Sequence, residues 1–549
     1  MIREHLRRMA TLLTATALLV AAPGSVWANG NKNTDASASL PTATPIKHVV
    51  VIFQENISFD HYFATYPYAT NPFAETPFYP KDDTPRVNNL LSGGLLTSNP
   101  NSTQPFRMDP AMSVTCDQNH SYGPEQSADD HGLMDKFPES VGTGTSTSSP
   151  CNDYGKGPGV TMGYFDGNTV TALWNYAQHY AMSDNSYSTM FGPSTVGALN
   201  LIAGTTSLAT LQPSADGSKA ATTANASGSI GGSALTGAAI GDPRPFYDDC
   251  VTTDPTTSKL YTKIRISVAG KNVGDLLNAK NITWGWFQGG FAPTSYTANG
   301  LPVCGANHNG LAGNDAVTTS GDYIPHHEPF EYFSQSTNQH HTRPSDSGLI
   351  GTSNDGANHQ YDLQDFWTAL SEDRLPTVTY LKAAAYQDGH PGYSDPLDEQ
   401  NFVVDVVNAL QNSRYWKDIA VIIAYDDSDG WYDHALGPIV NQSAVSDDTL
   451  GAGNCGSAKT NTQGQCGYGP RQPLLVISPY AKQNYVDHQV TDQSSILRFI
   501  EDNWNLGRIG GNSSDVKAGK LNGLFDFDDK KPATRLILDD STGTILQQF

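Results

Sequence analysis

The chain has 549 residues, of which only 16% are charged, and its formal net charge is -23 at pH 7. Such acidity argues against a nucleic-acid partner, which would need a basic face. It also repels anions, so a site for phosphate esters would need its own positive charge from a metal ion and protonated histidines. The length would allow several domains, but the sequence has no internal repeat and no linker between similar halves, so we expect one large domain.

Residues 1–28 have the three parts of a secretory signal peptide. A basic start is followed by an apolar run over residues 9–22 and by a small-residue cleavage site that ends at Ala28. The pair Arg7-Arg8 leaves twin-arginine export open as an alternative to the general route. The apolar run is short for a membrane span, so an anchor is the less favoured interpretation. We expect an exported protein, periplasmic or secreted, without a stable membrane anchor.

The mature chain is expected to consist of a disordered lead-in, residues 29–43, and a single domain, residues 44–549. Its six cysteines suit an oxidising compartment. Sequence alone does not fix their pairing, but Cys455 and Cys466 flank a short polar loop and are the favoured pair. No CxxC spacing occurs, which makes zinc ligation a poor alternative.

Two stretches that have the pattern of fully buried strands, residues 49–53 and 420–424, run into side chains with oxygen ligands. These side chains are Glu55 and Asn56 after the first stretch, and Asp426 and Asp427 after the second. Burying unpaired carboxylates is costly, and a bound divalent cation is the simplest compensation. Ligands of open α/β sheets bind outside the carboxyl ends of the strands, so one composite site is expected. The alternative is a turn in which the aspartates cap a helix.

A candidate nucleophile lies in the stretch FGPSTVGALN, residues 191–200. Its Gly-Pro pair forces a turn, Ser194 and Thr195 would begin a helix, and Gly197 would allow close packing. A hydroxyl at a helix N-terminus lies where backbone N–H groups and the dipole favour negative charge. That position would stabilise both an alkoxide and a phosphate. An ordinary Ser/Thr N-cap is the alternative.

Four histidines lie in stretches that are rich in turns and polar residues. They are His120 in DQNHSY, His326 and His327 in IPHHEPF, and His390 in DGHPGYSDP. A lone histidine such as His120 suits a surface or a helix start, and a paired His-His is commonly structural. The run around His390 has too many turn residues for a core, so this side chain should face a cleft.

The stretches ENISFDHYF, FGPSTVGALN and YDDSDGWYDH together resemble the bacterial phosphoesterase family of secreted acid phosphatases and phospholipases C. The resemblance extends over nearly the whole mature chain. It implies an α/β fold, a three-layer sandwich with a central, mostly parallel sheet and helices on both faces. The core would be alkaline-phosphatase-like and would carry long loop insertions.

The resemblance also implies roles for the candidate residues. One divalent metal ion of unknown identity would be held by Glu55, Asn56, Asp426, Asp427 and Ser194. Family members place a nucleophilic Ser or Thr directly after Gly-Pro, which selects Ser194 rather than Thr195 for attack on phosphorus and a phosphoserine intermediate. The catalytic group would further include the histidines His120, His326, His327 and His390. Asn56, His120 and His327 would bind the substrate's phosphate oxygens, and one histidine, left open, would protonate the leaving group.

The expected activity is that of a secreted acid phosphatase acting on phosphate monoesters, because histidines near their ordinary pKa gain charge in mild acid. A phospholipase C that cleaves phosphodiesters such as phosphatidylcholine is the alternative, although many larger relatives carry a long C-terminal extension that this chain lacks. The substrate would be a small phosphate ester or a phospholipid headgroup. An arylsulfatase would need a C/S-x-P-x-R motif, which is absent. An exported, non-catalytic surface-binding protein would leave the three matched stretches unexplained. The oligomeric state is not predicted.

Overall fold

The computed structural model describes residues 36–143, 156–218, 236–251, 263–310, 321–450, 455–457, 464–528 and 534–549. All of them belong to the unit Asp35–Phe549. The predicted signal peptide lies outside the described residues. Among the described helices, none combines the length and the apolar character that crossing a membrane requires.

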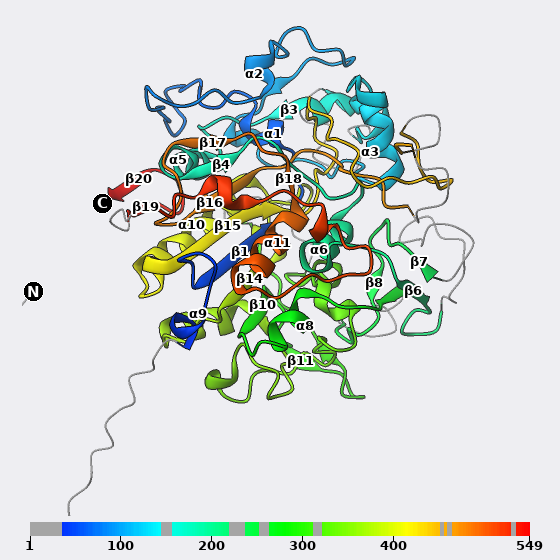
Figure 1. Cartoon of the computed structure of the whole chain (residues 1–549). Helices are drawn as coiled ribbons and strands as arrows, with labels where there is room; N and C mark the ends of the chain where they lie inside the picture. Colours follow the sequence, from blue (N-terminus) through cyan, green and yellow to red (C-terminus); the bar gives the residue numbers. More distant parts are fainter. Residues whose placement is uncertain are drawn as a thin grey trace, which may run out of the picture. The chain divides into compact units, whose positions relative to one another are not determined.

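An eight-stranded sheet lies at the centre of this unit, in the order β13-β10-β14-β1-β15-β16-β4-β17 (Figure 1). The strands are β1 (His48–Gln54), β4 (Ala181–Ser183), β10 (Trp284–Gln288), β13 (Gln360–Asp362), β14 (Val378–Lys382), β15 (Ile419–Tyr425), β16 (Leu474–Ile477) and β17 (Tyr485–Asp487). The strands from β13 to β15 are parallel, β16 is antiparallel to both of its neighbours, and β17 is parallel to β4. The predicted mostly parallel sheet is confirmed.

The central pair of strands is β1 and β15, and every residue of both is buried. Their uninterrupted apolar and β-branched runs suit a strand that is covered on both faces. The parallel register ends with Gln54 opposite Tyr425. The residues that follow each strand therefore leave the sheet at the same level, which confirms that the two predicted ligand stretches meet.

Helices cover the sheet on two sides. The α-helices of the described residues are α1 (Phe59–Phe63), α2 (Leu90–Gly93), α3 (Tyr122–Asp129), α4 (Phe137–Ser140), α5 (Thr171–His179), α6 (Ser194–Ala203), α8 (Val273–Asn278), α9 (Leu363–Ser371), α10 (Pro396–Asn412) and α11 (Gln493–Trp504). Helices α6, α8 and α11 contact one another on one face, and α5 packs against α10 on the other (Figure 1). The predicted three-layer α/β sandwich is confirmed.

The helix starts follow from local sequence. Asp395 caps α10 by accepting hydrogen bonds from the backbone N–H groups of Leu397 (2.8 Å) and Asp398 (3.1 Å), and Pro396 occupies the first helical position. Asp492 caps α11 by accepting a hydrogen bond from the backbone N–H of Ser494. These two N-caps thus fix the residues at which α10 and α11 begin.

Smaller elements and disulfides complete the described structure. A four-stranded sheet has the order β7 (Thr236–Gly237), β6 (Ala209–Gln212), β9 (Arg265–Val268) and β8 (Arg244–Pro245). Two-residue to four-residue strands pair as β2 (Phe106–Arg107) with β3 (Gly163–Tyr164), β5 (Ser186–Tyr187) with β18 (Thr491–Asp492), β11 (Ser295–Tyr296) with β12 (Pro302–Val303), and β19 (Leu536–Leu538) with β20 (Ile545–Gln548). Disulfides join Cys250 to Cys304 and Cys455 to Cys466, so the favoured pair is confirmed. Cys151 lies outside the described residues.

The described part of the expected lead-in makes contacts with the domain. Residues 36–39 form a 3-10 helix, and the Ala43 N–H donates to the Asn503 carbonyl at 2.8 Å. Lys47 Nζ donates to the Leu40 carbonyl at 2.6 Å, so backbone groups of this segment find partners in the domain. Composition alone did not indicate those partners.

Candidate active site

Four of the five predicted metal ligands meet at the carboxyl end of the central strands. They are Glu55 and Asn56 after β1, and Asp426 and Asp427 after β15, and none is more than 2% exposed. Asp426 Oδ1 accepts hydrogen bonds from the backbone N–H groups of Asn56 (3.0 Å) and Asp427 (2.8 Å). Asn56 has a positive φ of 56°, which asparagine tolerates better than most residues. The loop after β15 therefore fixes the turn after β1.

Ser194 lies among these side chains, while Thr195 points elsewhere. Ser194 is the first residue of α6, and its Oγ lies 3.0 Å from Glu55 Oε2 and 3.1 Å from Asp427 Oδ2. The hydroxyl of Thr195 instead contacts the hydroxyl of Tyr332 at 3.2 Å. The geometry thus favours Ser194 over its neighbour as the group that faces the ligand loops.

The Asn56 amide has partners in both of its orientations. With its oxygen toward α6, this oxygen lies 3.5 Å from Ser194 Oγ. Turned about, its nitrogen donates to Glu55 Oε2 at 2.6 Å and its oxygen accepts from His390 Nε2 at 3.0 Å. The amide therefore links the carboxylates on one side to a predicted pocket histidine on the other.

Gly197 lets α6 approach the loop after β15. A Cβ atom at this position would lie 2.1 Å from the Asp426 carbonyl oxygen, far inside van der Waals contact. Only glycine leaves room for this approach, which the sequence predicts from the small residue near the helix start. The close contact places the N-terminus of α6 against the ligand loops.

The ligand set carries more negative charge than its neighbour Lys382 balances. Lys382, the last residue of β14, forms a buried ion pair with the Glu55 carboxylate, and its Nζ lies 3.9 Å from Asp426 Oδ2. Burial and then Asp426 raise the pKa of Glu55, and burial raises the pKa of Asp427. Burial also opposes ionisation of Asp426, but Lys382 together with hydrogen bonds from Glu55 and the backbone N–H groups of Asn56 and Asp427 lowers that pKa. Buried oxygen donors with excess negative charge fit a hard divalent cation.

All four predicted histidines lie around the ligand loops. His327 Nδ1 lies 3.1 Å from Glu55 Oε1, and the rings of His326 and His327 are 4.5 Å apart. On the other side, His120 and His390 have ring centroids 6.0 Å apart. The structure therefore brings the predicted ligands, the predicted nucleophile and the predicted histidines into one site.

The histidine pKa values differ from the expectation that these side chains gain charge together in mild acid. Burial lowers the pKa of His326 to about 4, and it also lowers the pKa of His327 and His390. For His120, burial is outweighed by Asp427 and Asp429, and its pKa is raised. The expectation assumed histidines that are exposed to solvent. In the structure, burial and repulsion by neighbouring histidines lower the pKa of His326, His327 and His390, whereas nearby carboxylates raise the pKa of His120.

Two further groups of side chains beside the ligand loops have ligand atoms close enough to hold an ion. They are Glu55, His327 and Asp388 on one side, and Asp117, His120, His390 and Asp429 on the other. Both groups combine carboxylate oxygens with imidazole nitrogens, which suits several divalent metals. The fold and these groups suggest that the site uses metal.

Comparison with known proteins places this site in a family. The sequence matches the Phosphoesterase family over residues 46–507, which is most of the chain. The chain belongs to the phosphoesterase family. Non-hemolytic phospholipase C of Pseudomonas aeruginosa is 32% identical to this phosphoesterase over 166 residues, which are 28% of this chain and 24% of that protein. Non-hemolytic phospholipase C of Burkholderia pseudomallei is 29% identical over 269 residues, or 46% and 37% of the two chains. The matched regions thus cover well under half of these relatives.

Comparison with solved structures gives distant matches to this phosphoesterase. A protein of the alkaline phosphatase superfamily from Vibrio parahaemolyticus is 13% identical, with 70% of this chain and 69% of that chain covered and a TM-score of 0.26. A score this low supports no argument about the site. The fold assignment rests on the sheet and the helical layers themselves.

Several side chains that shape the site were not predicted from the sequence. Asp429 Oδ1 lies 3.2 Å from His120 Nδ1, and it stands in the same acidic stretch as the predicted ligands, so its position was available as a signal. Lys382 ends β14, the neighbour of β1, at the same edge of the sheet. Glu125 on α3 had no local signal, yet its carboxylate accepts from the Gly192 N–H at 2.9 Å and from the Ser428 hydroxyl at 2.7 Å. Glu125 thereby joins the turn before Ser194 to the loop after β15.

Proposed function

We propose that this phosphoesterase is a hydrolase of phosphate esters that forms a covalent phosphoserine at Ser194. The observation that carries this proposal is the position of the Ser194 hydroxyl. It begins a ten-residue helix and lies within 3.1 Å of carboxylate oxygens from the loops of two different strands. A helix N-terminus favours the negative charge of both an alkoxide and a bound phosphate.

The residues present fit one divalent cation, which Glu55, Asn56, Asp426, Asp427 and Ser194 would hold. When bound, such a cation would lower the pKa of the serine hydroxyl and neutralise phosphoryl oxygens. The chain's own groups do the rest. The Ser194 proton faces the oxygens of Glu55 and Asp427, which can accept it. Ser194 Oγ then forms a bond to phosphorus while the bond from phosphorus to the leaving oxygen breaks, and water later releases phosphate from the serine.

Among the four histidines, His120 is the one whose pKa is raised, because Asp427 and Asp429 act against the effect of burial. We therefore assign it to binding of phosphate oxygens and to protonation of the leaving oxygen. His326, His327 and His390, whose pKa values are lowered, would act as neutral donors and acceptors around the phosphate. Asn56 and His327 lie on the two sides of Glu55 and would orient the phosphate there.

Two substrate classes are consistent with this site. The lowered histidine pKa values weaken the argument for an acid phosphatase, and the similar proteins named above are phospholipases C. We therefore keep phosphate monoesters and choline-type phosphodiesters as equal candidates. Parallel assays with p-nitrophenyl phosphate and p-nitrophenylphosphorylcholine separate them by the ratio of kcat/KM. The two disulfides between described cysteines support an exported protein, periplasmic or secreted.

The proposal is tested by trapping the intermediate. Acid quench of the enzyme with labelled substrate should leave phosphate on the peptide that contains Ser194. Ser194→Ala should reduce kcat by several orders of magnitude. Thr195→Ala is the matched control and should cost only about 1 kcal/mol of stability from its lost contact to Tyr332. Normal turnover by Ser194→Ala, with no labelled peptide in the wild type, would refute covalent catalysis at this residue.

A further inference from the structure

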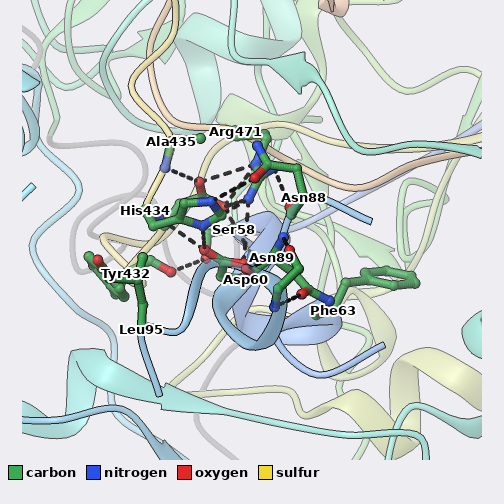
Figure 2. Close-up of polar contacts among 12 residues, drawn as sticks. Ser58, Asp60, Phe63, Asn88, Asn89, Leu95, Tyr432, His434, Ala435 and Arg471 are labelled. Atoms are coloured by element: carbon green, nitrogen blue, oxygen red, sulfur yellow. Dashed lines mark hydrogen bonds and ion pairs between the residues drawn. The ribbon is translucent and has the colours of Figure 1, made fainter. Parts of the chain in front are cut away.

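A buried ion network joins the same two loops again, a few residues beyond the ligands. It consists of Asp60 in α1, Asp433 and His434 at the end of the acidic stretch, and Arg471 just before β16. Asp60, Asp433 and Arg471 are at most 1% exposed, and the His434 side chain is 12% exposed. Figure 2 shows Asp60, His434 and Arg471 pointing toward one another. The network therefore links three segments that are far apart in sequence.

The two loops hold each other by reciprocal hydrogen bonds. The backbone N–H of Asp60 donates to Asp433 Oδ2 at 3.0 Å, and the backbone N–H of His434 donates to Asp60 Oδ2 at 2.9 Å. The imidazole Nδ1 of His434 lies 2.5 Å from the same Asp60 oxygen. In addition, the Ser58 hydroxyl donates to the Tyr432 carbonyl at 2.9 Å. Neither loop can shift without breaking contacts to the other.

Arg471 binds both carboxylates at once. Its Nε lies 3.1 Å from Asp433 Oδ1, and its Nη2 lies 3.1 Å from Asp433 Oδ2 and 3.4 Å from Asp60 Oδ1. Its remaining nitrogen, Nη1, donates to the carbonyls of Asn88 and Asp184, each at 2.8 Å. The rigid fork of the guanidinium group thus has a partner at every nitrogen.

A metal site is the competing interpretation, because Asp60, Asp433 and His434 have ligand atoms close enough to hold an ion. Arg471 already supplies the positive charge between these carboxylates, and a guanidinium does not lose its proton in proteins. The imidazole of His434, whose pKa Asp60 raises against the effect of burial, adds a second positive charge. Two cations therefore face two carboxylates, and no further ion is needed.

We infer that this network positions the catalytic site by fixing the separation between the loop after β1 and the loop after β15. This inference rests on the proposed function, since it assigns the network to the cation site and to the placement of Ser194. Only a short turn separates Asn56 from α1, so a displacement of Asp60 is transmitted to Glu55. A buried ion network adds little net stability compared with apolar packing, so geometric control is the benefit that it offers here.

The test measures divalent-cation affinity and kinetics in network variants. In Arg471→Met, the Kd for Mg²⁺, Mn²⁺ or Ca²⁺, titrated separately into metal-stripped enzyme by calorimetry, should rise about 10-fold or more, the range found when groups behind metal ligands are removed. The kcat should fall while KM changes little. Arg471→Lys keeps the charge without the fork and should recover part of both losses. Arg107→Met is the control, since Arg107 bridges Asp166 (2.7 Å) and Glu75 (3.2 Å) rather than Asp60 or Asp433.

The outcomes separate this inference from the proposed function. If the wild type neither binds these cations nor forms phosphoserine, the proposed function fails. If the wild type does both and Arg471→Met loses only thermal stability, with unchanged Kd and kcat, the network is merely structural and the inference is wrong. If Arg471→Met does not fold, His434→Gln decides by the same measurements, because it weakens the network at its partly exposed edge. Unchanged Kd and kcat in that variant would also overturn the inference.

Discussion

Replacing Gly197 by alanine tests whether close contact between α6 and the loop after β15 sets the active-site geometry. The new methyl group would lie 2.1 Å from the Asp426 carbonyl oxygen and 2.7 Å from its carbonyl carbon. Since ordinary contact begins at 3.4 Å, the helix and the loop must separate by about 1.3 Å. The atoms involved belong to the backbone, so no side chain can rotate away.

The expected magnitudes follow from this separation. An alanine inside a helix normally gains about 1 kcal/mol over glycine. Overpacking costs about 1–3 kcal/mol, and a clash with backbone belongs at the upper end, so the variant should lose about 2 kcal/mol of stability. Ser194 would move away from Asp427 by a comparable distance, and a misplacement of about 1 Å can cost on the order of 100-fold in rate.

The assay is kcat with p-nitrophenyl phosphate together with the free energy of unfolding from denaturant titration. Gly123→Ala in α3 is the matched control, because its new methyl group would meet nothing closer than 3.6 Å. That variant should keep its kcat and gain up to about 1 kcal/mol. A Gly197→Ala enzyme with wild-type kcat and equal or higher stability would refute the reasoning.

Three further outcomes are expected. Glu125→Ala removes the acceptor shared by Gly192 and Ser428, so it should lower kcat by a larger factor than it raises KM. A variant in which KM rises while kcat is unchanged would contradict this role. Burial and Asp515 raise the pKa of Glu501 to about 9, against 4.5 for the free group, so its contribution to stability is complete below pH 4.5 and is lost as the pH rises toward 9. The Tm of Glu501→Gln minus the Tm of the wild type should therefore increase with pH over this range. A Tm difference that does not change with pH would contradict this prediction. Chelation should lower the Tm, and adding a divalent cation at 100 times its Kd should raise the free energy of unfolding by about 2.7 kcal/mol. A Tm that chelation leaves unchanged would argue against a bound metal.

Sequence reasoning predicted the central part of the fold and the main groups of the site. The ligand stretches could be placed together because buried parallel strands end at one edge of a sheet, and Gln54 does lie opposite Tyr425. The choice of Ser194 over Thr195 came from the family resemblance, and the geometry now favours it. The roles of these residues stay predictions until variants are measured.

The remaining features depend on contacts that local sequence does not encode. Glu125 is a single glutamate in a helix, and only the three-dimensional arrangement places it between Gly192 and Ser428. The histidine pKa values depend on burial, which lowers the pKa of His326 to about 4 although its sequence context has many turn residues. Lys382 becomes part of the site because β14 is the neighbour of β1 in the sheet. The sequences of the two strands alone do not predict that they are neighbours.

The pairing of β1 with β15 has a consequence for how the protein folds. Asn56 and Asp426, which hydrogen bond at the end of these strands, are 370 residues apart in the chain. Contacts between residues so far apart in sequence form slowly, because the entropy of closing a long loop is lost before the strand pairing stabilises the chain. During synthesis, β1 is made long before β15, and until β15 is available the unpaired apolar edge of β1 can form non-native contacts. Activity should therefore appear late in refolding, after the helices α5 and α6 have formed, and aggregation should compete with it at high protein concentration.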